Sequence, residues 1–536
     1  MQSFLRHVLL SLTLFVSVAE DASAGEISEQ IAELTAGISS GGVDVVGNIR
    51  LGASRFVTDL YALRENEPIW LVDERRSDLL HELADAERHG FRADDFDVDD
   101  LAKLYAEAST GDAAAQARFD IAATEAAARL LHHVYYGKVD PTSFNANWSF
   151  ERAFAPGSPS RLVNQYLDVA SLGALIDDIE IRHPAYRRLQ EALVGYRSIA
   201  AQGGWPVVPD DKVLRPGEES AAIPRLKRRL AITGDFQGPV DDSLLYDDGA
   251  LRRAVEQFQT RHGLEADGVV GPRTFIALNR SVNDRIDQLR ASLERARWLF
   301  RDLESDYVFV NIGGPETYLV QDGQLVWKSR SIVGQAYRQT PVFRDEIQYM
   351  EFNPTWTVPV SIFQKDKLPL IRRDLSYLNR GNYTVLNSDG QPVNPTTVNW
   401  SGTPNVTLRQ EPGPKNALGQ VKFMFPNAYA VYLHDTDNRD LFDRNERNLS
   451  SGCVRIENPF EFADLLMKGD PNWSAVHRDA ILASGKTTRV SLPAPVPVLL
   501  TYFTAWMDEA GTVQFREDLY ERDGRVISAL NEAFRG

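Results

Sequence analysis

The sequence has little of what metal sites, disulfide scaffolds and phosphate-binding folds require. Its 536 residues include one cysteine, Cys453, and nine histidines. A single thiol cannot close an intramolecular disulfide or build a cysteine-rich zinc site. The chain also lacks the H-E-x-x-H, G-x-x-x-x-G-K-[ST] and G-x-G-x-x-G motifs. We therefore expect no metal site and no cofactor.

An excess of positive charge is missing as well. Asp and Glu outnumber Lys and Arg by 75 to 58, which gives a net charge of −17. Nucleic acids and anionic membranes reward clustered positive charge, so this balance argues against either as the main partner. The length and a hydrophobic fraction of 43% are enough for about three domains with real cores.

The first 24 residues have the order of charges and apolar residues of a secretory signal. Arg6 and His7 precede an apolar run from Val8 to Val18, and the small residues Ala22-Ser23-Ala24 follow it. That run is too short to span a bilayer, and an uncleaved membrane anchor is the lesser alternative. We expect a signal peptide over 1–24, a mature chain from near Gly25 and no integral membrane span after it.

The pattern of the mature chain predicts a multidomain α+β protein. Residues 25–200 are rich in helix formers and predict a mostly helical scaffold, in which a helix over Asp120–Tyr136 ends at Gly137. A stretch rich in Gly and Pro separates this region from a compact unit at 218–281 with three short helical segments. The alternative for this unit is a structural role without any ligand.

A connecting helix over 282–303 is expected next, with Asn283 as its cap. Its apolar residues repeat at spacings of three and four, which predicts one buried face: Ile286, Leu289, Leu293, Ala296 and Phe300. Strand patterns dominate 304–490, and Asp322-Gly323 between two strands predicts a hairpin turn. Residues 491–536 predict a further strand pair and a helix, packed on the scaffold or on the β-rich domain.

Cys453 lies in a setting that suits nucleophilic catalysis. It follows Ser450-Ser451-Gly452, Arg455 comes two residues later, and His434 ends a strand upstream. A base and a positive charge lower the pKa of a thiol, so we expect Cys453 as nucleophile and His434 as its base. Backbone N–H groups of Gly452 and Cys453 are the expected oxyanion donors. The alternative is a buried, inert cysteine.

Four further residues have weaker signals. Arg455 either lowers the thiol pKa or binds a substrate carboxylate, and the alternative for it is a structural salt bridge. Tyr432 alternates with His434 on its strand and should share its face, whereas Asp435 should face away and leave a backbone carbonyl to hold the imidazole. Trp356 either walls the pocket or is core.

The run from Tyr432 to Arg455 resembles the catalytic signature of the L,D-transpeptidases (YkuD domain), in the large periplasmic branch of YcbB type. Further runs that carry the likeness are Ser331–Phe343, Asn353–Pro359 and Gly413–Gly419, and Asp267–Asn279 resembles a peptidoglycan-binding module. Many YkuD domains read Ser-His-Gly-Cys, but here Ser451 replaces the second histidine. The resemblance adds Ser451 to Tyr432 and Trp356 as candidate substrate contacts.

The resemblance implies a periplasmic enzyme that attacks the bond before the terminal D-Ala of a tetrapeptide stem. A thioester on Cys453 would pass to the side-chain amine of a second stem and form a 3→3 cross-link. It also implies a capping insertion at 361–414, which we expect to be a mobile lid with a basic cluster of Lys365, Lys367, Arg372 and Arg373. Alternatives are an envelope protein or water as acceptor, or a non-catalytic wall-binding protein.

Overall fold

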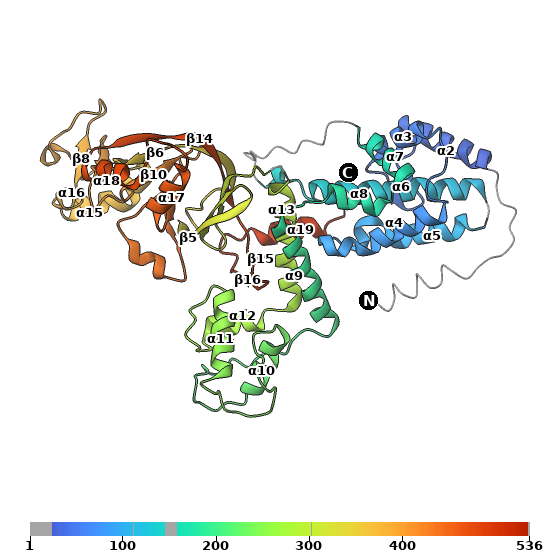
Figure 1. Cartoon of the computed structure of the whole chain (residues 1–536), viewed down its shortest axis with the longest axis horizontal. Coiled ribbons are helices and arrows are strands. Elements are labelled where there is room, and N and C mark those ends of the chain that lie inside the picture. Colours follow the sequence, from blue (N-terminus) through green and yellow to red (C-terminus); the bar gives the residue numbers. More distant parts are fainter. Residues whose placement is uncertain (1–23, 111, 145–157, 302, 534–536) are drawn as a thin grey trace.

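The computed structural model describes residues 24–110, 112–144, 158–301 and 303–533. The expected signal peptide at 1–24 lies outside the described residues except for Ala24. A helical region and a β-rich region occupy the two ends of the long axis, and a small helical unit projects from the middle (Figure 1). The fold is multidomain α+β, as the sequence predicts.

The helical region is built around one long central helix, α6 (Ala113–Tyr136). Asp112 caps α6 by accepting from the N–H groups of Ala114 and Ala115, and Gly137 ends the helix as predicted. Around α6 lie α2 (Ala24–Ser39), β1 (Val45–Val46), β2 (Ile49–Arg50), α3 (Ser54–Leu63), α4 (Asp73–Asp85), η1 (Ala86–His89), η2 (Ala93–Phe96), α5 (Val98–Ala108), η3 (Pro141–Ser143), α7 (Pro159–Val169) and α8 (Leu172–Ile179). The last helix of this region, α9 (Pro184–Ala201), packs on the later helix α13 (Val282–Leu299) instead.

The unit that projects from the middle consists of the three expected helices. They are α10 (Ile223–Ile232), α11 (Ala250–Arg261) and α12 (Pro272–Asn279), and they share a separate apolar core. The C-terminal end of α11 contacts the last part of the chain, where His262 stacks between Phe258 and Phe515.

The connecting helix α13 (Val282–Leu299) differs from the prediction in two respects. Ser281, not Asn283, is its N-cap, because Ser281 and Asp284 form a reciprocal capping box. From Gln288 onward the helix is buried on every side, so the prediction of a single buried face was too narrow. Several of its buried charges are paired, as in the 2.7 Å contact between Arg297 and Glu294. The helix α13 contacts both the helical region, through α9, and the C-terminal part of the chain.

The β-rich region is a closed sheet. Its strand order is β12-β5-β13-β11-β10-β6-β14-β3-β4, and a second pairing of β4 with β5 closes the ring. The predicted hairpin is confirmed, since Asp322 and Gly323 have φ values of 52° and 71° between β4 and β5. The elements are β3 (Tyr307–Asn311), β4 (Glu316–Gln321), β5 (Gln324–Gly334), β6 (Phe343–Phe352), β10 (Val421–Met424), β11 (Leu433–His434), η6 (Arg439–Asp443), β12 (Asn448–Ser450), β13 (Val454–Ile456), α17 (Pro459–Leu466), α18 (Ala475–Ala483) and β14 (Thr488–Thr501).

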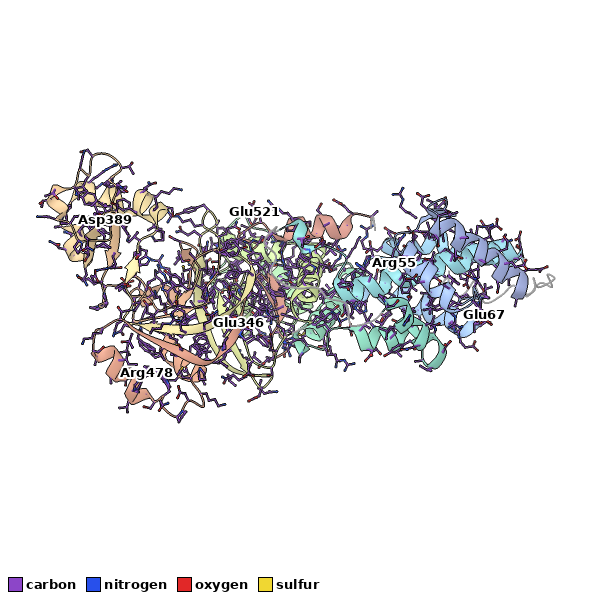
Figure 2. The ribbon with its side chains drawn as sticks, turned by 90° about the horizontal axis from the view of Figure 1, so that it is seen from above. Arg55, Glu67, Glu346, Asp389, Arg478 and Glu521 are labelled. Carbon is purple, nitrogen blue, oxygen red and sulfur yellow. The ribbon has the colours of Figure 1, made fainter. Side chains whose placement is uncertain are left out.

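A subdomain with its own small core is inserted between β6 and β10. We call it the cap (residues 356–418); it forms the outer end of the molecule, where Asp389 lies (Figure 2). The cap starts earlier than the expected residue 361, because β7 already belongs to its sheet. Its elements are β7 (Trp356–Thr357), α14 (Val360–Ile362), η4 (Phe363–Lys367), α15 (Leu368–Arg373), α16 (Tyr377–Arg380), β8 (Tyr383–Leu386), η5 (Pro395–Thr397) and β9 (Thr407–Gln410).

The C-terminal part of the chain is more closely integrated into the β-rich region than expected. The sheet does not end at residue 490, since β14 pairs with both β3 and β6 up to Thr501. Then follow β15 (Ala505–Met507), β16 (Val513–Phe515) and α19 (Asp523–Asn531), which packs on α13. The Lys138 ammonium donates to the carbonyl of Leu530 at 2.8 Å, so the tail joins sheet and scaffold. Among the described helices, none has the length and apolarity needed to cross a membrane.

Candidate active site

The turn that carries Cys453 is fixed by two hydroxyl groups. The Ser450 hydroxyl donates to the Cys453 carbonyl at 2.5 Å and accepts from the Gly452 N–H at 3.1 Å. The Thr340 hydroxyl donates to the Gly452 carbonyl at 2.9 Å. Gly452 has a φ of +123°, and a Cβ there would meet no atom closer than 3.9 Å. Glycine is therefore required by the backbone conformation rather than by a lack of space.

The oxyanion expectation needs a correction at Gly452. Its N–H is engaged by the Ser450 hydroxyl, so it does not point freely toward a substrate. Within the described residues, the N–H of Cys453 makes no backbone or side-chain hydrogen bond. Of the two expected donors, only Cys453 is available in this conformation.

Parallel pairing of β11 with β13 brings the candidate residues together. His434 is the partner of Arg455, and Leu433 is the partner of Val454. Partner residues of parallel strands project to the same side, and alternate residues share a face. Tyr432, His434, Cys453 and Arg455 therefore gather on one face. The rings of Tyr432 and His434 lie 5.6 Å apart, which confirms that these two share a face.

The Cys453 thiol is half-buried and rests against Tyr432. Burial raises the pKa of the thiol, whereas the Tyr432 backbone N–H and hydroxyl and the Arg455 charge oppose this rise. The net direction is upward, which corrects the prediction of a lowered thiol pKa. A thiol with a raised pKa is protonated at neutral pH, so a nucleophilic role for Cys453 would require a base.

His434 is held in the tautomer that this task requires, whereas burial lowers its strength as a base. Its Nδ1 lies 2.5 Å from the Asp435 carbonyl oxygen, so Nδ1 carries the proton and Nε2 keeps a lone pair. The imidazole is thus held by a backbone carbonyl, as predicted, while the Asp435 carboxylate faces away and accepts from the Gln420 N–H at 2.9 Å. Burial and the Arg455 charge lower the pKa of His434 to about 3. Among the described residues, the imidazole makes no hydrogen bond to the thiol, whose contacts are Tyr432 and, at 3.9 Å, the Ala430 carbonyl.

Arg455 forms no structural salt bridge within the described part of the chain. One of its guanidinium nitrogens donates weakly to the Thr436 hydroxyl at 3.4 Å, and its Nε is buried without a partner. Asp437 is near enough for its charge to support the guanidinium, although burial still lowers the pKa of Arg455. An unpaired, half-buried guanidinium next to the thiol is a group that can receive an anion.

Trp356 belongs to the core of the cap, with 9% of its surface exposed, and also contacts Tyr432. The four basic residues expected to form one cluster on the cap have different surroundings. The Lys367 ammonium lies 5.5 Å from the centre of the Trp356 ring, whereas Arg372 donates to backbone carbonyls such as that of Trp400. Lys365 and Arg373 are exposed.

Ser451 contacts Arg338, a residue for which the sequence predicts no role. Its hydroxyl accepts from Arg338 at 2.9 Å, and the same guanidinium forms a 2.6 Å ion pair with Asp366 of the cap. Arg338 and Thr340 both lie in the loop between β5 and β6, within the Ser331–Phe343 run. That run was noticed as a likeness, but no local pattern in it shows which side chain reaches Ser451 or Gly452.

Three parts of the chain match known protein families. Residues 305–473 match the YkuD family, described as "L,D-transpeptidase catalytic domain". Residues 219–278 match the family described as "Putative peptidoglycan binding domain", and residues 55–193 match the "Scaffold domain" family.

The chain is also similar to one curated protein and to solved structures. A Haemophilus influenzae protein named "Putative L,D-transpeptidase" is 37% identical over 222 residues, which cover 41% of this chain and 45% of the relative. The match thus spans less than half the length of that curated relative. A solved L,D-transpeptidase structure from Xylanimonas cellulosilytica is 16% identical and covers 55% of this chain and 99% of its own, with a TM-score of 0.18. A second one, titled "Structure of the Ldtfm-avibactam carbamoyl enzyme", is 14% identical and covers 37% and 49%, with a TM-score of 0.19.

These TM-scores are too low for the two structures to support any statement about this chain. The family matches coincide with the three regions seen in the fold, and the site described above lies inside the matched residues 305–473. The chain therefore carries a YkuD-type L,D-transpeptidase catalytic domain, together with a peptidoglycan-binding domain and a scaffold domain.

Proposed function

We propose that the protein is a periplasmic, cysteine-dependent L,D-transpeptidase that acts on peptidoglycan stem peptides. The observation that carries the proposal is the half-buried Cys453 thiol, which shares one face of the closed sheet with a neutral His434. The family match limits the reaction class, and the chemistry of these two groups supplies the steps. The periplasmic location rests on the signal-like sequence of residues 1–24 and on the peptidoglycan-binding match.

In the first half-reaction, Cys453 Sγ attacks the carbonyl carbon between the L-centre of the diamino acid and the terminal D-Ala. His434 Nε2 takes the thiol proton as the C–S bond forms. The developing oxyanion is stabilised by the Cys453 N–H. The C–N bond then breaks, the proton passes from the imidazole to the D-Ala amine, and a thioester remains on Cys453.

In the second half-reaction, the side-chain amine of another stem attacks the thioester. His434 accepts a proton from this amine, the C–S bond breaks, and the same proton restores the thiol. The product is a 3→3 cross-linked dimer, and no oxidant, metal or cofactor is consumed. Because the buried imidazole is neutral at ordinary pH, it can act as the base in both halves.

Two cations serve to receive the carboxylates of the stem. Arg455 has no carboxylate partner within 4.0 Å among the described residues, and Lys367 of the cap likewise has none. We propose that Arg455 binds a stem carboxylate and that the cap acts as a lid, with Trp356 and Tyr432 forming one wall of the stem-binding site. The Ser451–Arg338–Asp366 contacts support a closed position of this lid.

The acceptor is the least constrained part of the proposal. The same thioester can pass to an amine of an envelope protein, which would anchor that protein, or to water, which would make the enzyme a carboxypeptidase. A non-catalytic wall-binding role is a further alternative, against which the presence of Cys453, His434 and Gly452 argues.

The test is product analysis by mass spectrometry after incubation with a disaccharide-tetrapeptide, beside a Cys453→Ala control. The proposal predicts release of D-Ala and a 3→3 dimer only with the unaltered chain. Tripeptide without dimer would move the acceptor to water or to a missing protein. Unchanged substrate would contradict the catalytic assignment.

A further inference from the structure

A cavity of about 360 Å³, whose described lining does not include Cys453, lies where several parts of the chain meet. Its apolar walls come from the scaffold, from α13, from the β5–β6 loop and from α19, through Phe144, Trp298, Val342 and Val526. Glu521 lies on its rim, between the sheet region and the helical region (Figure 2). No step of the proposed transpeptidation uses this cavity.

Three guanidinium groups line the same space. Arg522 is the N-cap residue of α19 and Arg525 follows three residues later in its first turn, so both lie on the same side of the helix start. Within the described residues, neither has a carboxylate within 4.0 Å; Arg522 donates to the Gln339 side-chain oxygen at 2.9 Å instead. The charge of Arg295 is balanced by Asp523 at 2.5 Å.

The balance of charge in the cavity is positive. Glu521 is the single acidic side chain among the described lining residues, so two unpaired arginines face one carboxylate. The net charge of the whole chain, by contrast, is −17. In addition, two polar atoms in the wall are buried without a hydrogen-bond partner among the described residues, Arg295 Nη2 and the Tyr429 hydroxyl. Buried donors without partners are uncommon, and a bound acceptor is one way to satisfy them.

These features select the chemistry of a ligand. Paired guanidiniums at the start of a helix favour an anion with two coplanar oxygens, as in a carboxylate. The aromatic and aliphatic walls favour an apolar body over a bare inorganic ion, and the volume falls in the range of small-molecule sites. We propose that this cavity binds a small organic carboxylate, in which an apolar body carries one carboxylate group toward Arg522 and Arg525.

The cavity adjoins the support of the nucleophile. Tyr520 lines the cavity, and its hydroxyl donates to the Gly334 carbonyl at 2.5 Å. The Thr340 hydroxyl accepts from the Gly334 N–H and donates to the Gly452 carbonyl. A ligand in the cavity therefore lies against the loop that fixes the Cys453 turn. The binding proposal itself does not depend on the acyl-transfer chemistry.

The test uses the full mature chain with N-acetyl-phenylalanine, its carboxamide and inorganic phosphate as separate probes in isothermal titration. We expect the carboxylate to bind about tenfold or more tightly than either the amide or phosphate, since hydrogen bonds to charged groups have that magnitude. Arg525→Gln should weaken carboxylate binding by a similar factor, because it removes one of the two guanidinium groups. Arg525 is exposed, so its replacement should leave the fold intact. Arg182→Gln, which removes a surface arginine paired with Asp178 on the scaffold, is the matched control and should change nothing.

Several results would overturn the proposal. They are no binding of the carboxylate, equal binding of the amide, equal binding of phosphate, or an affinity that Arg525→Gln leaves unchanged. The last result would show that any binding does not involve Arg525. Repeating the titration with Cys453→Ala separates the two proposals, since cavity binding must persist in a chain that cannot form a thioester.

Discussion

Arg338 of the β5–β6 loop and Asp366 of the cap form an ion pair with an N–O distance of 2.6 Å. Arg338 also donates to Ser451, one residue from Gly452 in the turn that carries Cys453. The pair thus joins the cap to the turn that carries Cys453. It is the one direct polar link between η4 and that turn in the described part of the chain.

This link predicts that Arg338→Ala loosens the cap. The KM for a tetrapeptide should rise roughly two- to fivefold with little change in kcat, since partly exposed ion pairs contribute about 0.5–1 kcal/mol. Asp366→Asn should have the same effect, and the double variant should add little to either. Arg380→Ala removes a similar pair with Asp374 on the same subdomain and should leave KM unchanged. Equal effects of the two arginine variants would argue against a latch.

His434 should act as a base that remains neutral under acidic conditions. Its pKa is lowered to about 3, so the imidazole keeps its lone pair as the pH falls from 7 to 5. The rate of thioester formation should therefore show no acid limb near 6.5 in that interval. His434→Gln should slow the step by about 10²- to 10⁴-fold, and His477→Gln on the exposed face of α18 should not. An acid limb centred near 6.5 would contradict the buried, neutral state.

The Cys453 thiol should be a slow nucleophile toward small reagents. Because burial raises its pKa, alkylation by iodoacetamide at pH 7 should be slow and should accelerate with rising pH. Tyr432→Phe removes a hydroxyl that favours the thiolate, so the pH dependence should shift upward by about one unit. Tyr105→Phe in the scaffold is the control. Fast alkylation at pH 7 with a low apparent pKa would show that the thiolate is formed in advance.

Gly452→Ala tests the strained turn. With a φ of +123° and open space around it, the substitution adds strain of about 1–3 kcal/mol without a clash. Relief of that strain would displace Cys453, so thioester formation should be lost while the chain stays folded by circular dichroism. Gly485→Ala places the same change at another open, positive-φ site in an exposed loop and should keep activity. Full activity of Gly452→Ala would show that the turn tolerates other conformations.

Stability should fall as the pH drops below about 6.5. Burial lowers the pKa of five histidines, so below pH 6.5 the unfolded chain binds protons that the folded chain does not bind. The free energy of unfolding then falls by about 1.4 kcal/mol per pH unit for each histidine. They are His89, His133, His183, His262 and His434. Buried acids with raised pKa values, such as Asp120 at about 6, offset part of this loss.

The measurement is the midpoint of thermal unfolding at pH 7 and pH 5. His262→Phe keeps a ring between Phe258 and Phe515 but removes the titrating group, so its midpoint should fall less between the two pH values. His81→Gln on the surface of α4 is the control. If the midpoint of His262→Phe falls as much as that of the unaltered chain, His262 does not contribute to the pH dependence of stability.

Local signals gave the most reliable predictions from the sequence. The Asp322-Gly323 turn and the end of α6 at Gly137 depend on neighbouring residues only, and both are confirmed. The cap of α13 was misplaced because Asn283 and Ser281 are both good capping residues, and only the contact with Asp284 decides between them. The extent of β14 was missed because Pro493, Pro495 and Pro497 interrupt the usual strand pattern.

The site depended on contacts between distant parts of the chain. The motif around Cys453 pointed to His434, but the pairing of β11 with β13 and the contact of Arg338 with Ser451 have no local signature. The raised thiol pKa was also not predictable, since it is burial that outweighs the charge of Arg455.

Intact-protein mass spectrometry tests the central claim most directly. The mature chain is mixed with a tetrapeptide stem, quenched in acid within seconds and compared with Cys453→Ala. The account predicts a mass increase equal to the stem without its terminal D-Ala, located on the peptide that contains Cys453 and absent from the variant. No adduct on either chain, together with an intact tetrapeptide, or an adduct on a residue other than Cys453, would contradict it.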